Sequence, residues 1–295
     1  MYSGNDFYGI REIFLEYAGL PKWLPFPVAV QHGWQLVSTR FEQDSNPPEV
    51  WVWSSRIGAD YLNNNNAKSV RCVGSPFVYL LRNINYSKEE LLCGTICMPP
   101  HSSHFAKTNY SVDAYVNEII KLGPEYEPFT VMLYYLDMTD DVVNLYKSYG
   151  FDVVCNGSIF DVDFLKNFIK NSSGKKYCIS GMMGSGNFFC SIIGMKFINV
   201  NLSVNIVNEG NKNLTEAFFD KCNAAMAENL VVNRIDQDSF VRDELGVDFV
   251  MSRREMRWLI IKNYFKFRFI GKFGKHLIRS VLVAIGINKP KKILK

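Results

Sequence analysis

The middle of the chain alternates short apolar runs with amphipathic stretches. The apolar runs are rich in β-branched and aromatic residues and cover residues 93–98, 130–137, 152–155, 176–180 and 196–201. Stretches with helical periodicity lie between them, at residues 112–122, 140–149, 161–170 and 187–194. Asp140 and Asp161 are expected to cap two of these helices, and glycines stand where three should end: Gly123, Gly150 and Gly194. Continuous apolar strands that alternate with helices predict βαβ units and a parallel sheet covered on both faces.

The first part of the chain shows the same alternation in a less regular form. Strands are expected at residues 27–32, 50–53 and 69–73, helices at residues 9–18 and 56–62, and a linker near residues 86–90. A further helical pattern covers residues 213–229. We therefore predict an α/β protein of two Rossmann-like domains that face a cleft, formed by residues 1–88 and 89–210. A helical segment (residues 211–252) and a basic helical tail (residues 253–295) are expected to follow.

Composition and charge add one feature to this picture. Hydrophobic residues make up 47% of the 295 residues and charged residues 21%, which is the composition of a folded globular protein. The formal net charge of +4 is the sum of two unlike parts. Residues 253–295 contain 13 Lys and Arg and a single acid, Glu255, for a local charge of +12, and the rest of the chain carries −8. The chain is thus an acidic body with a cationic tail.

The sequence also bears on location. The first residues lack the basic and apolar regions of a secretory signal, and no stretch reaches the ~20 uncharged apolar residues that span a bilayer. Seven cysteines, an odd number in a chain large enough to build its own core, favour free thiols in a reducing compartment. We expect a cytoplasmic protein.

Ligands of open α/β folds bind beyond the carboxyl ends of the strands, so the turns after the predicted strands hold the candidate chemistry. The first such turn is Gln31-His32-Gly33-Trp34. A histidine at a strand tip, followed by a glycine that lets a ligand approach the backbone, suits a general base or a phosphate donor. The alternative is a histidine that only completes the hydrogen bonds of its turn.

The second turn contains His101, Ser102 and Ser103 after two prolines that stop the preceding strand. An imidazole and two hydroxyls offer hydrogen-bond donors to phosphate or ribose oxygens. A zinc site is the competing interpretation, because the spacing of four residues is loosely zinc-like: Cys93, Cys97, His101 and His104. Both cysteines fall on a predicted buried strand, where a thiol usually acts as a small core residue.

Two further turns are rich in glycine and serine. Gly157 follows the strand at residues 152–155 and can admit a nucleotide base close to the backbone, although a simple strand-to-helix connection accounts for it equally well. Residues 180–187 leave several N–H groups exposed at a helix start, which favours an anion, so Gly184 and Ser185, with Ser191, predict a phosphate site. Three acids after another strand suit either a base or metal site or helix capping: Asp137, Asp140 and Asp141.

Several of these segments together resemble a known family. They are G-S-P-F-x-Y-L (residues 74–80), P-P-H-S-S (99–103), L-Y-Y-L-D (133–137), N-G-S-x-x-D-x-D-F-L (156–165) and the glycine- and serine-rich run at residues 180–196. This succession resembles bacterial capsule and lipopolysaccharide glycosyltransferases of the GT-B fold. The resemblance implies transfer of a sugar from a nucleotide-sugar donor, bound mainly by the C-terminal half, to a surface glycan, with no metal and no bound cofactor.

The resemblance also implies roles for individual residues. In the branches that use CMP-activated acidic sugars, a His-Pro turn and a serine pair hold the nucleotide. Here the order is Pro100-His101 followed by Ser102, and Gly184-Ser185 stands in place of the serine pair. His32 would be the catalytic base on the acceptor side, and the donor would be bound by His101, Ser102, Ser103, Gly157, Gly184, Ser185 and Ser191.

The tail interleaves aromatic with basic residues, which is typical of a helix that lies on anionic lipid. Its aromatic residues are Trp258, Tyr264, Phe265, Phe267, Phe269 and Phe273. Nucleic acid is a competing partner, but the acidic body lacks a recognition motif, so none is expected. A C-terminal helix that is solvated or packs on its own protein is the remaining alternative.

The expectation is a glycosyltransferase held at the inner face of the cytoplasmic membrane by residues 253–295, with a glycan or lipid-linked acceptor. Two alternatives stay open. One keeps the fold and changes the reaction, to nucleotide-sugar epimerisation or polyol-phosphate transfer. The other is a non-catalytic subunit of a polysaccharide assembly machine that docks on the membrane through its tail.

Overall fold

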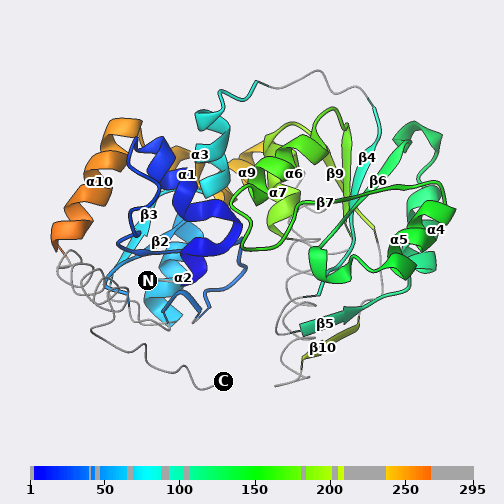
Figure 1. The fold of residues 1–295 in the computed structure, drawn as a ribbon, viewed down its shortest axis with the longest axis horizontal. Coiled ribbons are helices and arrows are strands. Elements are labelled where there is room, and N and C mark those ends of the chain that lie inside the picture. Colours follow the sequence, from blue (N-terminus) through cyan, green and yellow to red (C-terminus); the bar gives the residue numbers. More distant parts are fainter. Residues whose placement is uncertain are drawn as a thin grey trace, which may run out of the picture.

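A computed structural model of the chain describes residues 3–39, 41–43, 47–64, 69–87, 93–102, 106–180, 184–200, 205–208 and 237–266. The protein is α/β, with one parallel sheet of three strands and another of five. Figure 1 shows the smaller sheet with α1, α2 and α10 at one end of the molecule and the larger sheet with α4 and α5 at the other. The predicted fold class, α/β with parallel sheets, is confirmed.

The smaller sheet consists of β1 (Ala29–Val30), β2 (Val50–Val52) and β3 (Val70–Cys72), in that order. Its helices are α1 (Ile10–Tyr17), α2 (Ser55–Asn64) and α3 (Pro76–Asn83). Helix α3 was not predicted, although its start carries a clear signal. Ser75 caps it by accepting from the Phe77 N–H, and Pro76 occupies its first turn, where no N–H is needed.

The larger sheet consists of β4 (Thr95–Met98), β6 (Phe129–Leu133), β7 (Asp152–Cys155), β8 (Tyr177–Ser180) and β9 (Lys196–Asn199). Its order is β7-β6-β4-β8-β9, and every neighbouring pair is parallel. Counted along the chain this is 3-2-1-4-5, the order of a doubly wound, Rossmann-like sheet. The strand order reverses between β4 and β8, and ligands of doubly wound sheets bind beyond the carboxyl ends of the strands at such a point.

The connecting helices are α4 (Val112–Ile120), α5 (Asp140–Ser148), α6 (Phe164–Ser172) and α7 (Ser185–Ile192). Both predicted N-caps are wrong. The cap of α5 is Thr139, whose hydroxyl accepts from the Val142 N–H, and the cap of α6 is Asp163. The Asp161 carboxylate instead accepts from the Asp163 N–H at 2.9 Å, which closes a turn before the helix and delays its start to Phe164.

Several smaller elements were not predicted. Strands β5 (Ala106–Asn109) and β10 (Asn205–Asn208) form a separate antiparallel pair. Short 3₁₀ segments occur at η1 (Ser3–Gly9), η2 (Phe41–Gln43), η3 (Pro124–Tyr126), η4 (Tyr135–Asp137) and η6 (Val247–Phe249). Because η4 begins right after β6, the strand predicted at residues 130–137 ends at Leu133.

One hydrophobic cluster joins the two sheets. It includes Phe77 of α3 and Phe189 of α7, whose rings stack with centroids 4.2 Å apart. Each sheet has a second cluster on its outer face, which includes Tyr61 of α2 for the smaller sheet and Tyr115 of α4 for the larger one. The layer between the sheets is therefore a continuous core.

The described C-terminal part consists of α9 (Gln237–Glu244), η6 and α10 (Arg253–Lys266). Helix α10 packs on α1. Its Met256 and Ile260 are buried, the Arg257 Nε donates to the Ala18 carbonyl at 2.6 Å, and the Tyr264 hydroxyl donates to the Pro25 carbonyl at 2.7 Å. One face of α10 therefore packs on the protein itself, which is the alternative to membrane binding that the sequence left open for residues 253–266.

Parts of the sequence-based picture fall outside the described residues. These are the helix expected at residues 213–229, most of the linker near residues 86–90, and the tail beyond Lys266. Within the described ranges, no helix has the length and apolar character needed to cross a membrane. The six cysteines in these ranges are free thiols.

Candidate functional site

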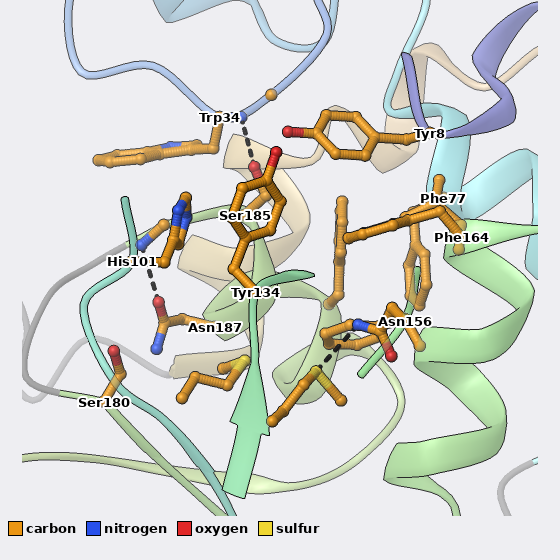
Figure 2. Close-up of a pocket in the computed structure, with 18 of the residues that line it drawn as sticks. Tyr8, Trp34, Phe77, His101, Tyr134, Asn156, Phe164, Ser180, Ser185 and Asn187 are labelled. Atoms are coloured by element: carbon orange, nitrogen blue, oxygen red, sulfur yellow. Dashed lines mark hydrogen bonds between the residues drawn. The ribbon is translucent and has the colours of Figure 1, made fainter. Parts of the chain in front are cut away.

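A cavity of about 380 Å³ lies where the carboxyl ends of strands from both sheets converge. Its wall includes His32–Trp34 after β1, Trp53 after β2, Pro99–His101 after β4, Tyr134 after β6, Asn156 after β7 and Gly184–Asn187 after β8. Figure 2 shows Trp34, His101, Ser185 and Tyr134 on one side of the cavity and Tyr8, Phe77 and Phe164 on another. The wall is mainly aromatic and aliphatic with a few polar groups, as in most small-molecule sites.

His32 is held by a buried carboxylate. Its Nδ1 lies 2.8 Å from Oε1 of Glu42, a residue of η2 whose side chain is 1% exposed. The imidazole packs edge to face against Phe41 and Phe7, with centroids 4.9 and 5.7 Å away. Because the carboxylate can only accept, Nδ1 carries a proton, and Nε2 is the ring nitrogen left to a ligand on a side chain that is 28% exposed at the cavity wall.

The Glu42 carboxylate accepts from three further groups. Oε1 accepts from the Gln35 side-chain amide at 2.9 Å, and Oε2 accepts from the hydroxyls of Thr39 at 2.9 Å and Tyr61 at 2.6 Å. Burial alone would raise the pKa of Glu42, but hydrogen bonds from His32, Tyr61 and Thr39 and the charge of His32 outweigh it and lower the pKa below 4.5. Glu42 therefore stays ionised and is suited to stabilise a positive charge on His32.

His101 lies on the opposite wall, after β4. Its Nδ1 donates to the Ser102 carbonyl at 2.9 Å, so Nε2 is the atom available to a ligand. The ring is tilted against the Tyr134 ring with centroids 4.8 Å apart. The residue is exposed, as expected for a group that would contact a ligand from the cavity edge.

The N-terminus of α7 faces the same cavity. The Ser185 Oγ accepts from the Trp34 N–H at 2.8 Å, which ties the turn after β1 to the turn after β8. The Asn187 Oδ1 accepts from the Gly184 N–H at 2.7 Å. Asn187 is 3% exposed, and among the residues that the structure describes no group pairs with its Nδ2. A buried amide donor and the positive end of a helix dipole at one place favour an anion.

Trp34 is fixed by a second set of contacts. Its indole N–H donates to Glu244 of α9 at 2.6 Å, and Arg56 forms two hydrogen bonds to the same carboxylate, at 2.6 and 2.7 Å. The indole is tilted against Phe188 of α7, with centroids 4.9 Å apart. Trp34 is therefore fixed in the cavity wall by α2, which packs on the smaller sheet, and by α7, which packs on the larger sheet.

The structure brings together four of the residues that sequence reasoning assigned to the site, namely His32, His101, Gly184 and Ser185. Ser102, Gly157 and Ser191 do not line the cavity. The Ser102 hydroxyl accepts from the Thr108 N–H at 3.2 Å, and the Ser191 hydroxyl donates to the Asn187 carbonyl at 2.9 Å. Gly157 has φ 95° in the turn before α6, and Asn156 beside it lines the cavity instead. Ser103 lies outside the described residues.

In the described ranges, no three His, Cys, Asp or Glu side chains are grouped as metal ligands. The acids after β6 and the described members of the zinc-like set therefore form no metal site there. The Asp137 carboxylate accepts from the Ser102 N–H at 2.9 Å and so shapes the turn after β4. Cys97 is buried and Cys93 is exposed, while His104 lies outside the described residues.

Sequence reasoning missed other wall residues and the residue that orients His32. Glu42 lies ten residues after His32 in an irregular segment, and only the fold brings the two together. Trp34 and Asn156 belong to segments that the sequence analysis singled out but received no role there, although the strand-end rule could have included them. Tyr8 precedes every predicted strand and carried no signal. Comparison with protein-family models, with curated proteins and with solved structures finds no match for this chain.

Proposed function

We propose that this chain is a glycosyltransferase with two Rossmann-like domains in the GT-B arrangement, which moves a sugar from a nucleotide-sugar donor to a surface glycan or a lipid-linked acceptor. One observation carries the proposal. A histidine oriented by a buried carboxylate, His32 with Glu42, faces a helix N-terminus across one cavity beyond the strand ends, where the buried amide of Asn187 has no hydrogen-bond partner among the described residues. The first pair suits a general base, and the second suits the phosphate of a leaving group.

In the proposed reaction an acceptor hydroxyl attacks the anomeric carbon of the donor. The bond between that carbon and the phosphate oxygen breaks, and a glycosidic bond forms. His32 takes the hydroxyl proton on Nε2, and the Glu42 carboxylate stabilises the imidazolium. The departing phosphate is met by the α7 N-terminus, the Asn187 amide and His101. In this proposal these side chains and backbone groups stabilise the negative charge on the leaving group, and the reaction uses no metal and no bound cofactor.

We also propose that α10 binds an anionic membrane surface, which would place the enzyme at the inner face of the cytoplasmic membrane beside a lipid-linked acceptor. The face of α10 turned away from α1 exposes Trp258 (67%) and Phe265 (69%) beside the exposed bases Arg254 and Lys262. Aromatic and basic side chains at spacings of three to four residues form one stripe of a helix. The following residues 267–295 add eight Lys and Arg and no acid. Such a face favours the headgroup region of anionic lipids.

Nucleotide binding tests the enzyme proposal. Isothermal titration of the full chain with CMP, UDP and GDP should show saturable heat for at least one, and the His32→Ala variant should bind it unchanged while losing transfer to acceptor. Absence of heat for all three would reject the proposal in favour of a non-catalytic assembly subunit. A bound nucleotide sugar that is epimerised without acceptor, or a polyol phosphate that is transferred, would favour the other reactions.

Vesicle flotation tests the membrane proposal. The chain should float with phosphatidylglycerol-containing vesicles at low salt, and the double substitution Trp258→Ser and Phe265→Ser should reduce the bound fraction. Leu62→Ser, which removes an apolar side chain that is 52% exposed on α2, is the matched control and should bind as the parent does. Equal flotation of both variants would reject a role for this face of α10.

A further inference from the structure

Tyr8 has an unusual backbone conformation for its size. Its φ and ψ are 58° and 16°, in the left-handed region, where the Cβ of an ordinary residue crowds the following carbonyl. Among the described residues, the other non-glycine residue with positive φ is Asn85, which stands in an exposed turn after α3. Asparagine tolerates this region and a bulky tyrosine does not. Conformations of this kind persist where the surroundings over-determine them, often at binding sites.

The surroundings of Tyr8 do fix it from both sheets. The Tyr8 N–H donates to the Ile159 carbonyl, in the turn after β7, at 2.6 Å. Gly9 beside it has φ 72° and lies so close to the Val162 carbonyl that no side chain would fit. Asn5 of the same segment donates to the Val28 carbonyl at 2.7 Å and accepts from the Val30 N–H at 2.9 Å, which binds η1 to β1. The segment is thus clamped between the strand that precedes His32 and the turn that precedes α6.

This clamp directs the tyrosine ring into the cavity. The ring packs at 4.8 Å from Phe164 of α6 and reaches toward Tyr134, whose hydroxyl end lies near its own in Figure 2. Burial, with a smaller contribution from Tyr135, raises the pKa of Tyr8 to about 12, so its hydroxyl stays neutral and both donates and accepts. No described group is hydrogen-bonded to this hydroxyl, which leaves it to a ligand.

The chemistry of this end of the cavity matches a neutral sugar. Phe77, Phe164 and Phe189 supply flat apolar surface, and the polar groups that Figure 2 shows near them, the hydroxyls of Tyr8 and Tyr134 and the amide of Asn156, are uncharged. An uncharged sugar ring offers C–H faces to the former and hydroxyls to the latter. A sugar that carries a carboxylate would give up its water here for phenol hydroxyls and aromatic carbon, which is unfavourable for a charge.

We infer that Tyr8 contacts the transferred sugar, and that the sugar bound against the hydroxyls of Tyr8 and Tyr134 is uncharged. The inference rests on the proposed glycosyltransferase function and adds to it a sugar-binding residue and a substrate class. It departs from the acidic-sugar donors of the branch whose motifs the chain resembles. It also makes η1 a part of the binding site.

A pair of tyrosine variants tests the residue. Tyr8→Phe keeps the ring, its contact with Phe164 and the backbone, and removes one hydroxyl. Tyr149→Phe is the matched control, because that hydroxyl donates to Asp113 at 2.7 Å on the exposed surface away from the cavity. By isothermal titration, Tyr8→Phe should weaken binding of UDP-glucose or GDP-mannose about two- to tenfold and leave binding of bare UDP or GDP unchanged. Equal behaviour of the two variants would overturn the assignment of Tyr8.

Matched donors test the substrate class. UDP-glucose against UDP-glucuronic acid, and GDP-mannose against GDP-mannuronic acid, differ in the carboxylate of the sugar. The neutral member of the pair whose nucleotide binds should bind at least about tenfold more tightly. Equal or tighter binding of the acidic member, or selective binding of CMP-N-acetylneuraminic acid, would overturn the inference while the proposed function survives. Failure of every bare nucleotide to bind would overturn both.

Discussion

The contact between His32 and Glu42 makes a quantitative prediction for Glu42→Gln. The amide oxygen can still accept from His32 and Gln35, while the hydroxyls of Thr39 and Tyr61 can rotate to accept from the new amide N–H groups. The variant therefore keeps the hydrogen bonds and loses the charge. Charge-assisted bonds are stronger than neutral ones, so we expect the free energy of unfolding to fall by about 1–3 kcal/mol, and the protein to stay folded.

The effect on transfer should be larger than the effect on stability. A carboxylate about 4 Å from a developing imidazolium is worth about 4 kcal/mol in a partly buried site, which corresponds to a rate loss of about 10²- to 10³-fold. Nucleotide binding should be unchanged, because Glu42 lies on the His32 side of the cavity. The assay compares the transfer rate and the nucleotide affinity of parent and variant, per folded molecule.

Glu49→Gln is the control for this experiment. Glu49 is also a buried carboxylate of the smaller sheet region, it accepts from the Trp51 indole at 2.8 Å and from Arg71 at 3.0 Å, and it does not line the cavity. Its substitution should cost comparable stability and leave the transfer rate of the folded protein intact. A Glu42→Gln variant that keeps more than half the parent rate, or a Glu49→Gln variant that loses as much, would refute the reasoning.

The lowered pKa of Glu42 sets the pH dependence of the same comparison. A carboxylate whose folded pKa is depressed contributes stability above its unfolded pKa and loses it as the pH falls through the folded value. The difference in unfolding free energy between parent and Glu42→Gln should therefore be full at neutral pH and shrink as the pH falls below 4.5. Denaturant titrations at a series of pH values measure this, and a constant difference down to pH 2 would contradict the assigned cause.

Three further predictions concern the cavity and its supports. Asn187→Asp puts a carboxylate where an anion is expected, so nucleotide affinity by titration calorimetry should fall at least about tenfold, and an unchanged affinity would argue against a phosphate there. Arg56→Met removes the partner of the buried Glu244 carboxylate and should lower the unfolding free energy in urea by about 1–3 kcal/mol; no loss would show that Trp34 alone satisfies Glu244. Gly246→Ala should reduce soluble yield and lower the melting temperature by several degrees, because φ is 61° and a Cβ would collide with the Trp53 carbonyl; a stable variant would imply that this loop relaxes freely.

The strands of the larger sheet could be predicted from the sequence because each strand has its own local apolar pattern. Buried parallel strands appear as continuous apolar runs, and β7 was predicted at its observed limits, residues 152–155. The same logic placed His32, His101 and Gly184 at strand ends, and the parallel pairing then brought those ends to one cavity. Local pattern and topology together suffice for such residues.

Other features depend on contacts that the sequence does not mark. Strand β1 has only two residues, because the Asn5 side chain substitutes for backbone pairing at its edge. Glu42 reaches His32 through an irregular segment, and Tyr8 reaches the cavity through a left-handed backbone turn. Helix caps fail for a related reason, since Thr139 and Asp140 are both acceptable caps and only the path of the chain selects between them.

The packing of α10 on α1 has a consequence for the order in which the protein folds. The hydrogen bond between Arg257 and Ala18 joins residues 239 positions apart, so α1 must wait for nearly all of the described chain to be synthesised before its outer face is covered. Until then the partners of Met256 and Ile260 remain in contact with water, and closing so long a loop is slow. The nascent protein should therefore expose apolar surface on α1 until α10 has been synthesised and has packed against it.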